Sequence, residues 1–331
     1  MKIVIVTINY NSSENTIKLL ESLKNQSDLA QSNSADRQSD RERTLSGASK
    51  DFEIIVVDNN SDDIGKLMDY KTSETNPAQS NPADYQQKWR TLGGAGIIYI
   101  KNDRNLGYSG GNNSGIRKAL QNGADWVLLL NNDTWAESSF MGRLKAVLEG
   151  KEGIVGLALD EGSRVAYAGQ IQWLKPTLIH IPTSQVGNRK SVDKLYAIGG
   201  AMFIYKNVFD KIGFFDENYF LYFEDADFCQ RARKAGIPIS FVSEIKIFHS
   251  VSASTKKLGS PMLLRYHYRN ALYFNLKNGP FYIKLLVWPW SWLVALKQII
   301  KIAVGKNKEQ SLAILKGVRD WYAGRMGKLH D

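Results

Sequence analysis

The feature that most constrains the fold of this chain is a series of four short, uninterrupted apolar runs. They occupy residues 2–8, 53–58, 97–101 and 126–131. Aliphatic residues at helical spacing follow the first run at residues 14–24, and a second helical pattern at residues 112–122 precedes the fourth run. Apolar strands that alternate with helices pack into a parallel sheet covered on both faces, so the pattern predicts an α/β fold.

Polar residues follow these runs where the strands are expected to end. In an open parallel sheet, ligands bind at the edge formed by the carboxyl ends of the strands. We therefore expect a site at this edge, built from four polar segments: residues 7–11, 58–62, 105–113 and 131–133.

Two polar tracts, at residues 24–51 and 71–96, interrupt this pattern. They resemble each other, with AQSNSADRQSDRERTLSGA at 30–48 and AQSNPADYQQKWRTLGGA at 78–95. We interpret them as copies of one inserted element in surface loops, where added length costs little closure entropy. Chance similarity of two polar loops and a functional pair of clamps are the alternatives.

Residues 256–331 differ from the rest of the chain in charge. They carry ten lysines and four arginines against three acids, a net charge of +11, whereas the whole chain carries +10. Within them, residues 285–296 are uncharged and rich in tryptophan, a run too short to span a bilayer. Tryptophans bracketed by Lys284 and Lys297 are typical of a helix lying in a membrane interface. The alternative is a helix docked on the protein with its tryptophans in the core.

Asp58 and a glycine-rich stretch are the first candidates for ligand binding. Asp58 ends the second apolar run, where its carboxylate could accept hydrogen bonds from a nucleoside or cap the next helix. Residues 105–115, NLGYSGGNNSG, match neither the P-loop nor the GxGxxG pattern. Asn112 and Asn113 in this stretch offer neutral donors to a phosphate or sugar.

Asp133 is the candidate metal ligand. It follows the fourth apolar run together with Asn131 and Asn132. Such a mixture of carboxylate and amide oxygens suits Mg²⁺ or Mn²⁺ shared with substrate phosphates. His249 follows a further apolar run and could complete the site with a nitrogen ligand.

Glu224, Asp225 and Asp227 are candidates for acid–base chemistry. They follow the aromatic run YFLYF. A partly buried acid in such surroundings is costly unless it is used, although a helix N-terminus also favours acids.

Together these segments resemble the GT-A glycosyltransferases of family 2, especially the bacterial rhamnosyltransferase-like branch. The matching stretches are VTINYN, VVDNNSDD, NLGYSGGNNSGI, LLLNNDTW, the run from GGAMFIYKNVFDKIGFFDENYF to LYFEDADFCQRARKAG, and HSVSAS. The resemblance implies a GT-A domain at residues 1–255, Rossmann-like, with a mostly parallel central sheet and helices on both faces. At residues 256–331, beyond the stretch that carries the resemblance, we expect a C-terminal helical, basic, tryptophan-rich region that associates with a membrane.

On the donor side, the resemblance implies nucleotide-sugar binding by eight residues. Around the base and ribose these are Thr7, Asn9, Asp58 and Asn60. Facing the nucleotide and diphosphate they are Asn105 and Asn112, and within this chain's version of the family's DxD motif they are Asn131 and Asn132. Asn131 stands where the motif has its first Asp, which leaves one charged ligand.

On the reaction side, the resemblance implies that Asp225 is the catalytic base and that Glu224 supports it or touches the acceptor. The remaining implied positions are the acceptor side and the metal or diphosphate ligands: Gly199 and Gly200, then Asp133 and His249.

The implied activity is an inverting, metal-dependent transfer of a hexose. A hydroxyl of a cell-envelope or lipid-linked glycan attacks the anomeric carbon of a nucleotide sugar, and Asp225 takes the hydroxyl proton. The favoured donor is dTDP-rhamnose and the second is a UDP-sugar, with Mg²⁺ or Mn²⁺ as cofactor. The alternatives are a nucleotidyltransferase, and a membrane- or nucleic-acid-binding protein with a degenerate transferase fold.

Composition adds an expectation about location. The single cysteine, Cys229, fits a reducing compartment, and the N-terminus lacks the pattern of a secretory signal. With the basic tail, this predicts a cytoplasmic protein, peripheral on the inner face of the plasma membrane, without a nucleic-acid partner. We expect Arg265 and Arg269 in the tail to meet the acceptor's diphosphate, and the sequence leaves the oligomeric state open.

Overall fold

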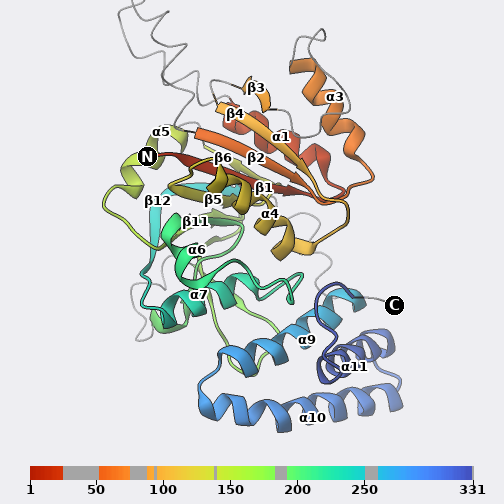
Figure 1. Ribbon diagram of the computed structural model, residues 1–331. Helices are drawn as coiled ribbons and strands as arrows, with labels where there is room; N and C mark the ends of the chain where they lie inside the picture. The colour runs from red at the N-terminus through yellow and green to blue at the C-terminus, as the bar shows by residue number, and fades with distance from the viewer. Residues whose placement is uncertain are drawn as a thin grey trace, which may run out of the picture.

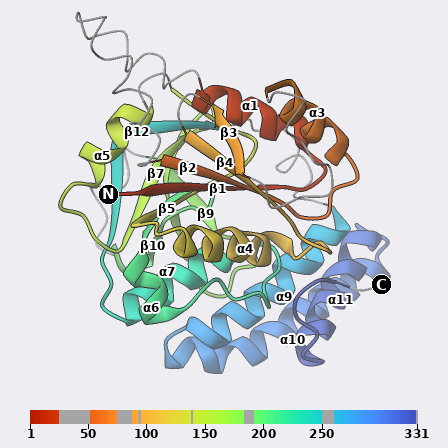
Figure 2. The same ribbon diagram turned by 45° about the horizontal axis from the view of Figure 1, so that its top comes forward.

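The computed structural model describes residues 1–24, 52–74, 88–92, 95–137, 140–182, 192–249 and 260–329. A central sheet lies between two layers of helices, and the C-terminal helices form a further group below one of these layers (Figures 1 and 2). The predicted α/β class with a C-terminal helical part is confirmed.

The four predicted strands form the parallel part of the sheet. Their bounds are β1 (Ile3–Asn9), β2 (Phe52–Asp58), β4 (Ala95–Lys101) and β5 (Trp126–Leu130). They lie in the order β4-β2-β1-β5, and the register places Asn9 opposite Asp58. Two of the predicted polar segments therefore leave the sheet side by side.

The other half of the sheet is largely antiparallel. Its strands are β6 (Thr134–Ala136), β7 (Ile154–Asp160), β8 (Val165–Gln170), β9 (Ile179–Pro182), β10 (Leu195–Tyr196), β11 (Ala201–Tyr205) and β12 (Ile239–His249). Strand β11 runs antiparallel to both β5 and β7, whereas β12 runs parallel to β7. Because β12 also pairs with β6, His249 lies opposite Thr134, close to the end of β5.

Helices cover both faces because successive strand residues point to opposite sides. Ile3 and Ile5 pack in the cluster with α1, α3 and α5, whereas Val4 and Val6 pack in the cluster with α4, α6 and α7. This double burial is why the apolar runs are uninterrupted. The helices are α1 (Ser13–Lys24), α3 (Ile64–Glu74), α4 (Gly107–Gln121), α5 (Phe140–Leu148), α6 (Lys206–Ile212) and α7 (Glu224–Lys234), and a short 3₁₀ helix spans Val192–Lys194.

Helix α4 begins five residues earlier than predicted and takes up most of the glycine-rich stretch. The reason is close packing on the sheet. A Cβ at Gly115 would overlap Val6, and a Cβ at Gly111 would lie 3.0 Å from Ile8 Cδ1. The glycines therefore allow α4 to pack closely on the strands, and most of them lie in the helix and not in a phosphate-binding loop.

The C-terminal helices α9 (Pro261–Asn278), α10 (Phe281–Ala303) and α11 (Lys308–Tyr322) pack on one another. The prediction that Arg265 and Arg269 face an acceptor is wrong for this arrangement. Arg265 Nε donates to Asp320 Oδ2 at 2.6 Å, and Arg269 is fully buried. A buried guanidinium needs such internal partners, which removes both from a substrate surface.

Much of the two polar tracts falls outside the described residues, including most of the repeated sequence. Within the second tract, residues 88–92 form β3 (Lys88–Leu92), which pairs antiparallel with β4 at the sheet edge. That part of the tract is an edge strand, where a loop was predicted.

Candidate functional site

Asn9 is the centre of a buried polar network at the ends of β1 and β2. Its Nδ2 donates to Asp58 Oδ1 and to Ser61 Oγ, both at 3.0 Å, and its Oδ1 accepts from Thr16 Oγ1 at 3.0 Å. Asp58 also accepts from the Ser61 backbone N–H, at 3.1 Å. Both Asn9 and Asp58 are fully buried. They hold the two loops together. Asp58 accepts within the turn after β2, whereas helix α3 begins only at Ile64, so this bond is not the helix cap that the sequence analysis considered.

Asn59 has a structural role that the sequence analysis missed. Its Nδ2 donates to Asn105 Oδ1 at 3.0 Å and to the Gly107 carbonyl at 2.9 Å. Its Oδ1 accepts from Asn102 Nδ2 at 3.1 Å. Asn59 thus joins the ends of β2 and β4 to the start of α4, and it fixes the predicted ligand Asn105.

The other predicted donor-side residues lie around this network. Thr7 is buried in β1, and within the described ranges its hydroxyl has no hydrogen-bond partner. Asn112 is buried in α4 and donates to the Tyr108 carbonyl at 3.0 Å. Asn60, with φ of 64°, is exposed at the rim. Of these three side chains, Asn60 is the one open to a ligand in this conformation.

A tight turn after β5 carries the DxD-like residues. The Asn131 carbonyl accepts from the Thr134 backbone N–H at 3.2 Å and from its hydroxyl at 2.6 Å. Asn132 Nδ2 donates to Thr16 Oγ1 at 3.0 Å, which ties this turn to the Asn9 network. The turn presents Asp133 toward the end of β12.

Asp133 and His249 form the predicted pair. Asp133 Oδ1 lies 3.2 Å from His249 Nε2, and Glu161 Oε1 lies 3.9 Å from His249 Nδ1. Burial lowers the pKa of His249, but the hydrogen bond to Asp133 and the two carboxylate charges outweigh burial and raise it overall. Glu161 and its neighbour His180, which lies 3.9 Å away, were not predicted from the sequence.

The donor set suits a divalent cation that the substrate helps to hold. One carboxylate and one imidazole leave most coordination positions to diphosphate oxygens and water, as Mg²⁺ and Mn²⁺ accept. Across the described ranges, no group of three or more His, Cys, Asp and Glu side chains is arranged to hold a metal. Asp133 and His249 are the described pair whose chemistry fits a cation shared with substrate oxygens.

Glu224 and Asp225 begin α7 after an unusual turn. Asp225 Oδ2 accepts from the Gly199 backbone N–H at 3.1 Å, and Oδ1 accepts from the Ala226 N–H at 2.7 Å. Glu224 is buried, and within the described structure its Oε2 has no hydrogen-bond partner. Burial raises the pKa of both carboxyls, and the charge of Asp225 raises that of Glu224 further. The backbone donors limit the rise at Asp225, so Asp225 is the better seat for the negative charge.

Gly199 and Gly200 connect the two halves of the site. A Cβ at Gly199 would lie 3.2 Å from Tyr108 Oη and 3.3 Å from Asp225 Cβ, and a Cβ at Gly200 would lie 2.7 Å from Asn131 Nδ2. Burial, and then the charges of Glu224, Asp225 and Asp133, raise the pKa of Tyr108 well above its usual value. The predicted base, the predicted acceptor glycines and the DxD-like turn are therefore neighbours, with Tyr108 between them.

Asp227, the third acid of the aromatic segment, is structural. It is fully buried and bonds to Arg231 Nε at 2.8 Å, Lys277 Nζ at 2.8 Å and Asn278 Nδ2 at 2.7 Å. These contacts fasten α7 to α9.

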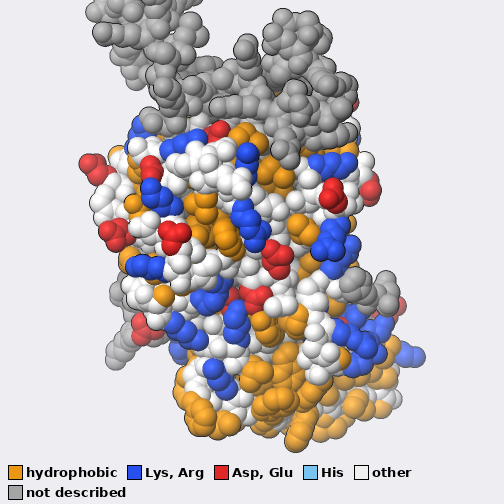
Figure 3. Space-filling model, viewed as in Figure 1, with side chains coloured by type: hydrophobic (Ala, Val, Ile, Leu, Met, Phe, Trp, Pro, Cys, Tyr) orange, Lys and Arg blue, Asp and Glu red, His pale blue; other side chains and the backbone are white. Residues whose placement is uncertain are grey.

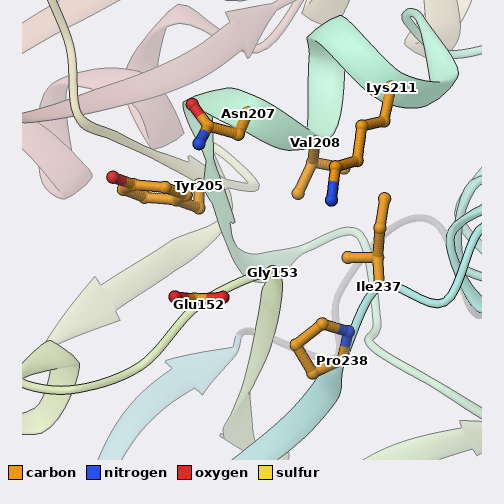
Figure 4. A pocket seen from close by; sticks show the side chains of 8 residues that line it. All are labelled: Glu152, Gly153, Tyr205, Asn207, Val208, Lys211, Ile237 and Pro238. Atoms are coloured by element: carbon orange, nitrogen blue, oxygen red, sulfur yellow. The ribbon is translucent and has the colours of Figure 1, made fainter.

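A separate hollow lies at the opposite edge of the sheet (Figure 4). It is lined by residues around the start of β7, the end of β11, helix α6 and the start of β12, among them Glu152, Tyr205 and Lys211. Tyr205 pairs with Trp126 at the amino end of β5, whereas the site lies at its carboxyl end. None of the predicted site residues lines this hollow.

Sequence comparisons identify relatives of this chain. The profile of a family described as "Glycosyltransferase like family 2" matches residues 44–263. Agl10 of Haloferax volcanii, a low-salt glycan biosynthesis hexosyltransferase, is 31% identical over 189 residues, 53% of this chain and 58% of that protein. The dTDP-rhamnosyl transferase RfbF of Shigella flexneri is 26% identical over 233 residues, 65% of this chain and 76% of its own. An N-acetylglucosaminyl-diphospho-decaprenol L-rhamnosyltransferase of Mycobacterium tuberculosis is 23% identical over 121 residues, 36% and 39% of the two chains.

Solved structures share the fold. The mannosyltransferase PcManGT from Pyrobaculum calidifontis, in complex with GDP-Man and Mn²⁺, has a TM-score of 0.51 at 11% identity, covering 98% of this chain and 88% of its own. S. aureus TarS 1-349 in complex with UDP-GlcNAc has a TM-score of 0.50 at 14% identity, covering 98% and 93%. The predicted GT-A architecture is confirmed.

Proposed function

The chain belongs to glycosyltransferase family 2, and on that premise we propose that it transfers rhamnose from dTDP-rhamnose to a hydroxyl of a cell-envelope or lipid-linked glycan. Support comes from two relatives whose names specify a dTDP-rhamnosyl transferase and a rhamnosyltransferase for a diphospho-decaprenol acceptor. The fold neighbour solved with UDP-GlcNAc makes a UDP-sugar the second donor to test. Family membership favours sugar transfer over nucleotidyltransfer and over binding alone.

The observation that carries the proposal is the setting of Asp225. Its carboxylate is held by the backbone N–H groups of Gly199 and Ala226, and burial raises its pKa. A raised pKa makes a carboxylate a stronger base, which suits it to accept the proton of an attacking hydroxyl. With the acceptor hydroxyl on the Asp225 side of the anomeric carbon and the leaving diphosphate on the opposite side, direct displacement inverts the configuration of that carbon.

The other residues have complementary roles. Gly199 and Gly200 let the backbone pack directly against Tyr108, Asp225 and Asn131, which keeps the Gly199 N–H in contact with the proposed base. Neutral Glu224 leaves the charge on Asp225. Asp133 and His249 would hold Mg²⁺ or Mn²⁺, which supplies positive charge that stabilises the leaving diphosphate.

The surface of α10 supports a membrane location. One stripe of the helix is buried against its neighbours, formed by Ile283, Val287, Ser291 and Gln298. The opposite side exposes large apolar residues, with Trp292 at 67% and Leu293 at 65% exposure. This side forms a broad hydrophobic surface at the bottom of the molecule in Figure 3. Exposed apolar area of this extent marks an interaction site.

The charge and packing of this region favour a peripheral, cytoplasmic position. Among the described residues, α10 is the one helix whose length and composition would allow it to cross a membrane. Its buried stripe contacts α9 and α11, which favours a helix lying along a lipid surface. The net charge of +11 over residues 256–331 would be attracted to an anionic inner leaflet.

A donor screen tests this function. The full chain is incubated with dTDP-rhamnose, UDP-glucose, UDP-N-acetylglucosamine and GDP-mannose, with Mg²⁺ or Mn²⁺ and a decaprenyl-diphosphate-linked sugar acceptor in detergent. We expect selective turnover of dTDP-rhamnose that EDTA abolishes and added metal restores. Selective use of another donor would overturn the rhamnose assignment, and full turnover in EDTA would overturn the metal assignment.

A further inference from the structure

A strained segment directly precedes the proposed base. Phe220, Tyr222 and Phe223 all have positive φ, at 61°, 70° and 75°, and Glu224 and Asp225 follow at once. Bulky residues rarely adopt this conformation, because the side chain crowds the backbone. Such strain persists only where surrounding contacts impose it. We call residues 219–223 the strap.

Asn270 of α9 provides hydrogen bonds that hold the strap in this conformation. Its side chain is fully buried, and its Nδ2 lies within hydrogen-bonding distance of three strap carbonyls, those of Tyr219 at 2.9 Å, Leu221 at 2.8 Å and Tyr222 at 3.2 Å. Its Oδ1 accepts from Arg269 Nε at 3.0 Å. One amide thus satisfies carbonyls that the strained backbone turns toward α9.

Two ring contacts from the same face of α9 extend this support. Tyr266 stacks on Phe220 with centroids 5.5 Å apart, and His267 stacks on Tyr222 at 4.1 Å. Burial lowers the pKa of His267 to about 4, so the stacked imidazole is neutral at physiological pH. The rings and the amide together hold the strap residues in place.

The other side of the strap faces the substrate site. The Phe220 carbonyl accepts from the Tyr108 backbone N–H at 2.7 Å, at the start of α4. A Cβ at Gly107 would overlap Phe220, so the strap also lies close against the glycine-rich segment. A shift of the strap would therefore move both the first turn of α7, which carries Asp225, and the contact with Tyr108.

We propose that Asn270 is a positioning residue, which holds the strap so that the carboxylate of Asp225 stays in reach of the acceptor hydroxyl. This inference rests on the proposed function, because it takes Asp225 as the base. Asn270 is buried, and apart from its contact with Arg269 its side-chain hydrogen bonds go to the strap. Its loss is expected to lower kcat while leaving the affinity for the donor unchanged, because the donor network around Asn9 and Asn59 does not involve α9.

The test compares Asn270→Ala with Asn275→Ala in the full chain. Asn275 lies on the same helix, is equally buried, and donates to the Ala271 carbonyl while accepting from Leu174 N–H, so it does not touch the strap. Both variants are measured for Tm, donor affinity, kcat, KM and hydrogen exchange of residues 219–225. If Asn270→Ala does not fold, Asn270→Ser replaces it, since a hydroxyl can serve one of the carbonyls.

We expect Asn270→Ala to lose about 100-fold in kcat, the scale of effect that small misplacements of reacting groups cause, with unchanged donor affinity and faster exchange in the strap. Asn275→Ala should lower Tm by a similar amount and keep kcat. Equal loss of kcat in both variants, or unchanged strap exchange in Asn270→Ala, would overturn the positioning role. Faster strap exchange with full turnover in both Asn270→Ala and Asp225→Asn would instead overturn Asp225 as the base.

Discussion

Glu224 is buried and the adjacent Asp225 is partly buried, and their local hydrogen bonds decide which of the two carboxyls carries the charge. Asp225 accepts from two backbone N–H groups, whereas among the described residues Glu224 Oε2 has no partner. Hydrogen bonds to a carboxylate stabilise its ionised form, and burial without them favours the neutral acid. The pair therefore contains one base and one neutral neighbour.

Exchanging each carboxyl for its amide tests this division of roles. Asp225→Asn should lower kcat by about 10²–10⁴-fold, the usual contribution of a general base, with donor affinity retained. Glu224→Gln resembles the neutral acid and should retain most of the activity. Steady-state turnover and donor titration measure both. A larger loss in Glu224→Gln than in Asp225→Asn would assign the base to Glu224.

The raised pKa values also predict opposite effects of pH on activity and stability. Asp225 must be ionised to act, so kcat falls as the pH drops through its pKa, which burial sets above the ordinary value. The folded state binds protons more tightly than the unfolded chain at both carboxyls. Their contribution to stability is therefore full below the ordinary carboxyl pKa of about 4 and is lost as the pH rises through the folded-state values.

Denaturation and kcat profiles against pH check this prediction. At neutral pH, Glu224→Gln and Asp225→Asn should both have a higher Tm than the wild type, because neither ionises. The Tm advantage should shrink on acidification. An acidic limb of kcat at or below the ordinary carboxyl pKa would contradict the raised value at Asp225.

At this scale the sequence predicted residue types better than their exposure. Asn59 and Asn60 are adjacent and identical, yet Asn59 is a buried link and Asn60 is exposed. The strap was missed because positive φ usually falls on Gly or Asn, whereas here it falls on Phe and Tyr, under tertiary contacts from α9. Contacts between segments this far apart in the sequence cannot be predicted from the spacing of residues along the chain.

At the scale of elements, α4 shows how packing overrides propensity. Glycine is a poor helix former, and the predicted helix began only at residue 112, near the end of the glycine-rich segment. The structure instead places Gly107 to Gly115 inside α4, where the missing side chains let the helix approach β1 and β2. The approach brings α4 and the carbonyl of Gly107 to Asn59.

Gly115→Ala tests this packing against a matched control. The new methyl would overlap Val6 and lie 3.0 Å from Val57 Cγ2, so overpacking should reduce the free energy of unfolding by about 1–3 kcal/mol. Gly142→Ala in α5 meets nothing within 4 Å and should increase that free energy by about 0.5–1 kcal/mol through helix propensity. Urea denaturation measures both, and stabilisation by Gly115→Ala would contradict the close approach.

At the scale of the whole molecule, the sheet was predictable because double burial forces continuous apolar strands. The antiparallel half was less predictable, since its strands differ widely in length and burial pattern and pair across distant parts of the chain, as β12 does with β6. The C-terminal helices pack some of their tryptophans against one another and expose others. Trp321 packs on Trp288 with centroids 5.1 Å apart, whereas Trp292 is mostly exposed. The helices thus form a docked layer with one open apolar side.

That open side leads to the last prediction, that the whole molecule binds anionic bilayers through α10. Replacing Trp292 and Leu293 together by Glu should weaken sedimentation with phosphatidylglycerol-containing vesicles by at least about tenfold, since each buried side chain contributes about 1.5–3 kcal/mol. Ile179→Glu, an exposed apolar position on β9, is the control and should bind as the wild type does. Binding should weaken with salt and on pure phosphatidylcholine, because the basic C-terminal region adds an electrostatic attraction. Equal binding by the double variant would show that α10 does not contact lipid, and resistance to carbonate extraction would indicate a spanning helix in place of a peripheral one.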